Sequence, residues 1–195
     1  MSRIVKDPEE RREELLQIGI RFFLQGGDIN VSIQKVVKEA NVATGLFYYY
    51  FKTKEEFLEK AHERYLHDYV GHLEEIIRNK NIAVMDRLNL LLEQFGIRFR
   101  EVSRMYQDKP PNNPKHFAIL ESLIINKLAE SVTVFVKEGC ETGCFHTASP
   151  DLTALFVVCG LVGILQRIHF VDSCRADEEI RRIVLTALSI EGADL

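Results

Sequence analysis

The chain has 195 residues, of which 46% are hydrophobic and 28% are charged, and its formal net charge at pH 7 is −4. This composition is that of an ordinary globular protein and excludes the fibrous and globally disordered classes, while the weakly acidic charge alone does not indicate a nucleic-acid-binding protein. The charge is unevenly distributed, because residues 1–60 carry ten basic and ten acidic side chains, whereas residues 61–195 carry fifteen and nineteen.

The sequence predicts a soluble, cytoplasmic protein. Its first sixteen residues lack the apolar segment of a signal peptide. The longest uncharged apolar run, residues 154–165, has twelve residues, whereas a helix needs about 20 to cross a bilayer. The four cysteines lie in the C-terminal half, mostly within or beside apolar helical pattern, which is typical of reduced thiols. They are Cys140, Cys144, Cys159 and Cys174.

Helical periodicity with almost no strand alternation predicts an all-α fold. We expect the first helix to begin at Pro8, with Asp7 as its N-cap, and to end at the glycine pair 26–27. A second helix of about two turns follows Ser32, which can cap it. The apolar residues of this helix share one face, and they are Ile33, Val36, Val37 and Ala40.

A tight turn and a third short helix come next. Asn41 tolerates the left-handed backbone conformation that such a turn needs, and the third helix is expected over about 43–50. Residues 53–56 form a capping box that begins a fourth helix, which continues to about Arg78. Two short helices joined by a turn, after a longer helix, are the parts of a helix-turn-helix, whose second helix enters the major groove of DNA.

The outer face of the third helix predicts contacts with DNA. Phe47 and Phe51 can point inward together with Val42. The residues left pointing outward are Thr44, Gly45, Leu46, Tyr48 and Tyr49. Tyrosine hydroxyls donate to phosphates, glycine lets the backbone approach the duplex, and Lys52 and Lys54 add positive charge. The alternative is that the tyrosines only pack a small three-helix core.

The segment 33–61, IQKVVKEANVATGLFYYYFKTKEEFLEKA, resembles the DNA-binding domain of the TetR family of repressors, and the resemblance extends back to about residue 8. The residues that carry it are Ala40, Val42, Gly45, Tyr48, Tyr49, Phe51, Lys52, Lys54 and Phe57. Three positions depart from the family pattern. Asn41 replaces the usual turn glycine, Ala43 replaces a serine that caps the recognition helix, and Leu46 replaces a common threonine.

The resemblance implies a role for each of several residues on double-stranded operator DNA. The residues expected to hold phosphates are Ser32, Tyr48, Tyr49 and Lys54. Those expected to face the bases are Gln34, Thr44, Gly45 and Leu46. It also implies that the rest of the chain senses a small molecule and forms a homodimer.

Further helices are predicted in the C-terminal part, which brings the total to eight or nine. One carries a continuous apolar stripe from Met85 to Tyr106, and a loop over 107–116 precedes the next, over about 119–139. The last two are expected over about 150–171 and 177–189. We therefore divide the chain into a helix-turn-helix DNA-binding domain, residues 1–52, and a helical regulatory and dimerisation domain, residues 53–195.

The apolar stripe is first of all core, although part of it could line a ligand pocket. Asn126 is expected on the apolar face of its helix, where a polar group needs a partner. The candidate ligand-binding residues are Phe95, Phe99, Tyr106, Leu120 and Asn126. The helix from residue 150 is apolar almost all round, which favours a dimer interface. The resemblance to the TetR family implies that the last two helices of each copy pair around a two-fold axis, and the residues then expected near that axis are Leu155, Phe156, Val162 and Leu188.

Other functions have less support in the sequence. Cys140 and Cys144 lie one turn apart near His146, but two thiols and one imidazole are an incomplete metal or redox site. The chain has no Gly-rich phosphate loop, nucleophile elbow or paired metal-binding motif, so no enzyme, cofactor or metal is expected. A purely structural helical oligomer would leave the exposed tyrosines unexplained. The sequence thus favours a repressor that a small, largely apolar ligand releases from a palindromic operator.

Overall fold

The computed structural model describes residues 7–27, 30–106, 114–166 and 176–190. Within these ranges the fold is all-helical, as the sequence predicts. The helices are α1 (Pro8–Gly26), α2 (Ile33–Glu39), α3 (Thr44–Tyr50), α4 (Lys54–Arg78), α5 (Val84–Tyr106), α6 (Pro114–Glu141), α7 (Pro150–Gln166) and α8 (Ala176–Ala187). No helix in this part of the chain is long and apolar enough to cross a membrane.

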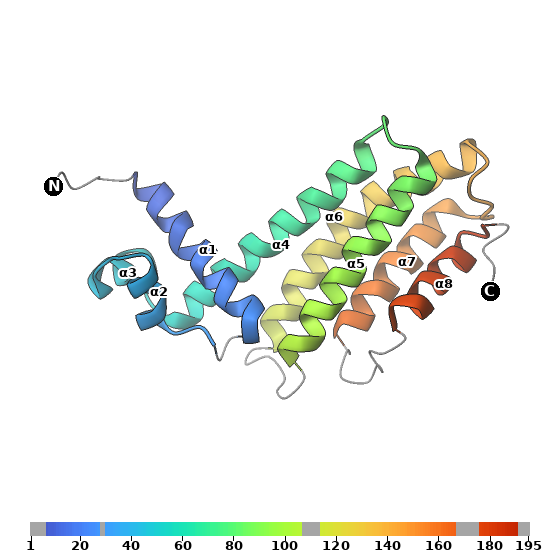
Figure 1. The fold of residues 1–195 in the computed structure, drawn as a ribbon. Helices are drawn as coiled ribbons and strands as arrows, with labels where there is room; N and C mark the ends of the chain where they lie inside the picture. The colour runs from blue at the N-terminus through green and yellow to red at the C-terminus, as the bar shows by residue number, and fades with distance from the viewer. Residues whose placement is uncertain (1–6, 28–29, 107–113, 167–175, 191–195) are drawn as a thin grey trace.

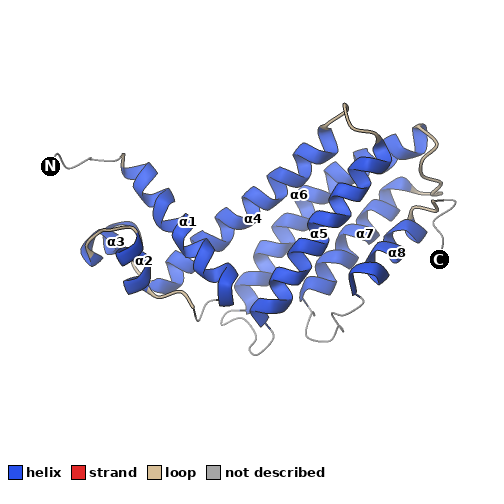
Figure 2. Ribbon diagram, viewed as in Figure 1, coloured by secondary structure: helices blue, strands red, loops and turns tan. Residues whose placement is uncertain are grey.

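The helices form two groups that α4 joins. Figure 1 shows α1, α2 and α3 gathered around the first turns of α4, while α5 and α6 pack beside the rest of it and α7 and α8 complete the bundle. The ribbon in Figure 2 consists of helices and short connections. Because α4 belongs to both groups, a change in its position within the bundle would also move α2 and α3.

Three local signals in the N-terminal sequence are confirmed. The Asp7 carboxylate accepts a hydrogen bond from the Glu9 backbone N–H at 2.8 Å, so it caps α1. The Thr53 hydroxyl accepts one from the Glu56 backbone N–H at 3.0 Å and caps α4. Asn41 has a φ of 51°, the left-handed conformation expected of the turn between α2 and α3.

The structure differs from the expected helices in three places. Ser32 is the N-cap residue of α2, but its side chain makes no capping hydrogen bond. The loop predicted to extend to residue 116 is shorter, since α6 begins at Pro114, where a proline suits the first turn of a helix. At the C-terminal end α8 stops at Ala187, and Ser189 has a φ of 49°. Residues 167–171, predicted to continue α7, lie outside the described residues.

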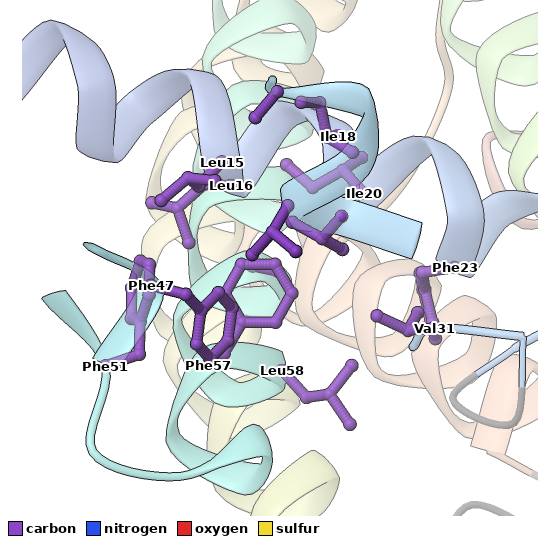
Figure 3. Close-up of a cluster of buried hydrophobic side chains, with 14 residues drawn as sticks. Leu15, Leu16, Ile18, Ile20, Phe23, Val31, Phe47, Phe51, Phe57 and Leu58 are labelled. Carbon is purple, nitrogen blue, oxygen red and sulfur yellow. The ribbon is translucent and has the colours of Figure 1, made fainter. Parts of the chain in front are cut away.

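The N-terminal helices enclose their own hydrophobic core, shown in Figure 3. We call this the N-terminal core, and its buried residues are Leu15, Leu16, Ile18, Ile20, Phe23, Val31, Val36, Val37, Ala40, Phe47, Phe51, Phe57, Leu58 and Ala61. A Cβ built on Gly19 would lie 2.4 Å from the Phe57 ring, so this glycine allows α1 and α4 to pack closely. The core continues past residue 53 into α4, and the domain boundary between residues 52 and 53 stays a prediction.

A buried arginine anchors the far end of α4 in the bundle. Arg87 of α5 donates hydrogen bonds to the carbonyl oxygens of Ile77, at 2.6 Å, and Ile82, at 3.1 Å. It also donates to both carboxylate oxygens of Glu138 on α6, at 2.6 and 3.1 Å, and its guanidinium lies 5.2 Å from the Phe135 ring centroid. Because a buried charge is costly without such partners, this cluster holds α4, α5 and α6 in one arrangement.

The Arg87 cluster makes stability depend on pH through Glu138. Hydrogen bonds from Arg87 and Lys80, only partly opposed by burial, lower the pKa of Glu138 to about 2. Because this pKa is lowered on folding, the stabilisation is present above about pH 4.5 and is lost as the pH falls towards 2. Glu138→Gln should lower the free energy of unfolding by of the order of 3 kcal/mol at neutral pH.

Urea denaturation of both proteins between pH 7 and pH 2 measures this contribution. The difference in the free energy of unfolding between wild type and Glu138→Gln should decrease as the pH falls from about 4.5 to 2. The exposed carboxylate of Glu75 on α4 provides the control, since Glu75→Gln should leave the profile close to wild type. A gap that stays constant over the whole pH range would show that the charge of Glu138 is not what stabilises the fold.

Candidate nucleic-acid interface

α3 is fixed by two aromatic side chains that point into the N-terminal core. Phe47 and Phe51 lie one turn apart and are both buried. Their ring centroids are 5.4 Å apart, and each lies 5.0 Å from the ring centroid of Phe57 on α4. Tilted and edge-to-face contacts of this kind add stability beyond the burial of apolar area. One face of α3 is therefore held by packing, and the other face is left to the solvent.

The solvent face of α3 presents two tyrosines. Tyr48 is 51% exposed and Tyr49 is 75% exposed. Tyr50, by contrast, is half-buried and packs against the N-terminal core. The interpretation that the tyrosines only pack the core therefore holds for Tyr50 and not for its two neighbours. Adjacent large aromatic side chains in solvent are typical of a contact surface.

The first turn of α3 is open to a partner. Thr44 and Gly45 are exposed, and Leu46 is half-buried. Ala43 is the N-cap residue and offers no side-chain hydrogen bond. A Cβ built on Gly45 would meet nothing within 4 Å, so the packing of the described chain does not require a glycine there.

Replacing Gly45 with alanine should separate folding from DNA binding. We expect the free energy of unfolding to rise by up to about 1 kcal/mol, because alanine favours a helix over glycine and the added methyl group meets nothing in the chain. We expect DNA binding to weaken, because the methyl group would stand between the backbone and the duplex. Thermal unfolding and fluorescence anisotropy with labelled DNA measure the two effects.

Gly71 on α4 is the matched control for this substitution. A Cβ there also meets nothing within 4 Å, and the residue lies in the bundle rather than on α3. Gly71→Ala should therefore raise stability in the same way and leave the affinity for DNA unchanged. If Gly45→Ala bound DNA as tightly as Gly71→Ala does, the first turn of α3 would not be in close contact with the duplex.

α2 contributes polar and basic side chains beside α3. Gln34 is exposed, as expected of a residue that faces bases, and Ser32 is half-buried. Lys35 and Lys38 are also exposed on this helix, although they were not among the residues predicted to bind DNA. Their position between the apolar residues of α2 is the signal that could have found them, since Gln34 and Lys38 are one turn apart and share a face.

The two lysines predicted to add positive charge flank Thr53, the N-cap residue of α4. Lys52 is exposed and Lys54 is half-buried. The carboxylate of Glu56 accepts a hydrogen bond from the Lys52 backbone N–H at 2.8 Å, and Thr53 caps the helix. Glu56 places a negative charge at this helix N-terminus. A phosphate bound near Lys54 would therefore lie close to the Glu56 carboxylate.

The candidate ligand-binding residues whose side chains are described do not all lie together in the structure. Phe95 and Phe99 are buried in a core cluster with Val102 of α5 and residues of α8. The side chains of Tyr106 and Leu120 lie outside the described residues. Asn126 is exposed, so its expected place on the apolar face of α6 is wrong.

The residues predicted to lie near a dimer axis differ in their exposure, and the interface itself stays a prediction. Leu155 and Phe156 are exposed on α7, as residues of an interface between chains should be. Val162 and Leu188 are instead buried within one chain. Leu188 belongs to a second cluster of buried residues, which we call the C-terminal core and which consists of Ile77, Val84, Leu88, Phe135, Val136, Phe145, Ala154, Val184 and Leu188. The expectation that these two lie near a two-fold axis is wrong, because they already pack against their own chain.

The three cysteines that the structure describes differ in their surroundings. Cys140 and Cys144 are half-buried and pack against the C-terminal core. Cys174 lies outside the described residues, and Cys159 is exposed on α7. Across the described ranges no three histidine, cysteine or acidic side chains are grouped to hold a metal ion.

The comparison with protein families points to the same N-terminal segment. Residues 15–61 match the model described as bacterial regulatory proteins, tetR family. This range begins in α1, includes α2 and α3, and ends in the first turns of α4. It therefore coincides with the helices that enclose the N-terminal core.

Curated relatives are similar to longer or shorter parts of the chain. The HTH-type transcriptional repressor KstR2 of Mycolicibacterium smegmatis is 27% identical over 150 residues, which are 74% of this chain and 71% of that protein. The HTH-type transcriptional regulator YerO of Bacillus subtilis is 28% identical over 92 residues, which are 47% of this chain and 31% of that protein. The match with YerO thus spans less than a third of that relative.

A solved structure shows the same fold over nearly the whole chain. The crystal structure of the reduced form of Escherichia coli NemR superposes with a TM-score of 0.70 at 19% sequence identity. The match covers 94% of this chain and all of that chain. At this identity the likeness concerns the fold, and it extends the agreement from the N-terminal helices to the bundle of α5 to α8.

Proposed function

We propose that the chain is a repressor of the TetR family, whose model matches residues 15–61, and that it binds a palindromic operator as a homodimer. We further propose that a small molecule bound in the C-terminal helices releases it from DNA. The proposed DNA-binding domain is residues 1–52, and the proposed regulatory domain is residues 53–195.

The observation that carries this proposal is the solvent face of α3. Tyr48 and Tyr49 are exposed on a helix whose opposite face is fixed by Phe47 and Phe51. A rigid helix with exposed hydroxyl groups can be placed in the major groove without first being ordered. Tyr48 and Tyr49 would bind phosphates, while Gly45 would allow the helix backbone to approach the base edges.

A second copy of the chain is needed for a palindromic operator, and α7 offers a surface for it. Its exposed apolar residues at 152, 155 and 156 lie on one face of the helix, and Ile183 of α8 is exposed as well. Large apolar side chains gathered in solvent are typical of an interface. A two-fold dimer would present two copies of α3 at adjacent turns of the same side of DNA.

The proposed release by ligand depends on α4. The helix begins in the N-terminal core and ends at the Arg87 cluster, so its two ends are anchored in different groups of helices. A ligand that prefers one position of α4 would change the separation of the two recognition helices. The equilibrium can shift only as far as the ligand's affinities for the two arrangements differ.

Selection of binding sites from a random pool of double-stranded DNA tests the proposal. We expect the protein to enrich inverted repeats whose half-sites are centred about 10 base pairs, or a multiple of that, apart. The double variant Tyr48→Phe/Tyr49→Phe keeps both rings and loses both hydroxyl groups, so it should enrich the same sequences with lower affinity. Enrichment of no sequence, or of single sites without symmetry, would refute a dimeric operator-binding repressor.

A further inference from the structure

A cationic side chain lies between α4 and α5, on the side of the bundle next to the N-terminal core. The side chain of Arg98 on α5 is only 11% exposed. Its guanidinium carbon lies 4.6 Å from the ring centroid of Tyr65 and 6.0 Å from that of Tyr69. These tyrosines are one turn apart on α4, so the guanidinium lies against a face of two aromatic rings. Such contacts attract a cation, and Arg98 also forms a hydrogen bond with the Tyr65 side chain.

The hydrogen-bond donors of Arg98 are incompletely paired. Its Nη1 atom lies 3.9 Å from the Oε2 atom of Glu101, too far for a hydrogen bond. The same carboxylate oxygen accepts a hydrogen bond from the Tyr65 hydroxyl at 2.5 Å. Among the residues that the structure describes, the buried Nη1 atom has no hydrogen-bond partner at all. An arginine stays charged in a protein, so the fold keeps a buried cation with an unsatisfied donor.

This arrangement differs from that of the other buried arginine. Arg87 has a carboxylate that accepts from two of its nitrogens and two backbone carbonyl oxygens, which satisfy its donors. A cation that serves only to hold helices together is stabilised by such a set of partners. Within the described part of the chain, no carboxylate binds Arg98 in a bidentate manner, which is the arrangement that the planar guanidinium favours most.

Tyr65 links this cation to the helices proposed to bind DNA. Its ring packs against the N-terminal core, and its hydroxyl group donates to Glu101 of the bundle. Burial raises the pKa of Tyr65 to about 12, so the hydroxyl stays protonated and remains a donor at neutral pH. A change in the charges around Arg98 and Glu101 would therefore directly affect Tyr65, whose ring packs against the N-terminal core.

We propose that Arg98, together with Tyr65 and Tyr69, binds the carboxylate group of an acidic organic effector. The effector carboxylate would accept two parallel hydrogen bonds from the guanidinium, and its apolar body would lie among aromatic side chains. Glu101 would then lose its cation, and the Tyr65 contact between bundle and N-terminal core would change. This inference rests on the proposed function, in which a small molecule releases the repressor from DNA, and it names the chemical class of that molecule.

Thermal unfolding of the full-length protein with matched pairs of probes tests the proposal. The probes are sodium benzoate, phenylacetate and octanoate, each compared with its neutral primary amide at equal ionic strength. Wild type should show a saturable rise in Tm with at least one carboxylate and none with the amide of the same body. The same carboxylate should lower the affinity for operator DNA in fluorescence anisotropy.

Two variants and a control assign the response to Arg98. Arg98→Met should weaken carboxylate binding by about tenfold or more. Arg98→Lys keeps the buried positive charge but loses the planar guanidinium. This variant should therefore also bind the carboxylate more weakly, although the charge is retained. Arg100→Met removes an exposed cation from the same helix and should leave the response to carboxylates unchanged.

The outcomes separate this inference from the function on which it rests. Equal responses to carboxylates and amides, no response to any carboxylate, or full binding by both Arg98 variants would overturn the proposed site. If wild type bound operator DNA and still ignored every carboxylate, only the acidic effector would be refuted. Selective carboxylate binding by a protein that binds no DNA would instead support the site and refute the repressor.

Discussion

Replacing Phe156 with aspartate is expected to separate the proposed dimer into monomers and to weaken binding to a palindromic operator by about 100-fold. Phe156 is 66% exposed on α7, and Leu152 and Leu155 lie beside it on the same face. Burial of these side chains against a second copy would remove a large apolar area from water. A carboxylate at the centre of that surface would have to lose its hydration without a partner.

Sedimentation velocity and fluorescence anisotropy measure the two consequences of Phe156→Asp. Ile97→Asp is the matched control, because Ile97 is an exposed apolar residue on α5 rather than on the α7 surface. This control should remain dimeric and bind DNA as wild type does. A Phe156→Asp protein that stayed dimeric with undiminished operator affinity would show that another surface joins the two copies.

Replacing Phe47 with alanine is expected to destabilise the N-terminal helices by about 3 to 5 kcal/mol and to abolish DNA binding. The Phe47 side chain has no exposed area, and its ring contacts those of Phe51 and Phe57. Removing it leaves a cavity between α3 and α4 that a short helix cannot close without moving. The solvent face of α3 would then no longer be held in one orientation.

Tyr49 lies two residues away and provides the opposite case. Because its side chain is largely exposed, Tyr49→Ala should change the free energy of unfolding by less than about 0.5 kcal/mol and still weaken DNA binding. Urea denaturation followed by circular dichroism, and amide hydrogen exchange of α3, distinguish the two variants. Equal destabilisation by Phe47→Ala and Tyr49→Ala would contradict the assignment of one face to the core and the other to DNA.

The N-terminal part of the fold could be predicted because its signals are local. Asp7 and Thr53 cap helices through backbone groups only two or three residues away. Asn41 adopts its left-handed conformation for reasons that belong to the residue itself. The inward direction of Phe47 and Phe51 follows from helical spacing. Each of these expectations depends on neighbours in the sequence, and each is confirmed.

The bundle was harder to predict because periodicity alone does not say which side faces which neighbour. α7 is apolar almost all round, so the sequence could not separate Val162, which packs within the chain, from Phe156, which does not. On α6 the buried side is marked by Leu128 and Phe135, seven residues apart, and Asn126 lies off that side. Its expected burial was wrong because the apolar face was judged from the residues preceding it.

The charged clusters were missed because they join residues far apart in the sequence. Arg87 and Glu138 are separated by 51 positions, and Tyr65 and Glu101 by 36. Nothing in the spacing of basic residues on α5 distinguishes Arg87 or Arg98 from an exposed arginine such as Arg100. Only the packing of α4 and α6 against α5 shows which of these cations are buried and that, among the described residues, the Nη1 atom of Arg98 has no hydrogen-bond partner.

The central claim is that the solvent face of α3 binds DNA, and one measurement tests it most directly. Fluorescence anisotropy would be recorded with labelled DNA from the region upstream of the protein's own gene, at two salt concentrations, for wild type and Tyr48→Ala. We predict sequence-selective binding by wild type that weakens as salt rises and that the variant loses. Absence of binding to this DNA and to a random pool of palindromes, or binding that Tyr48→Ala retains in full, would contradict the account.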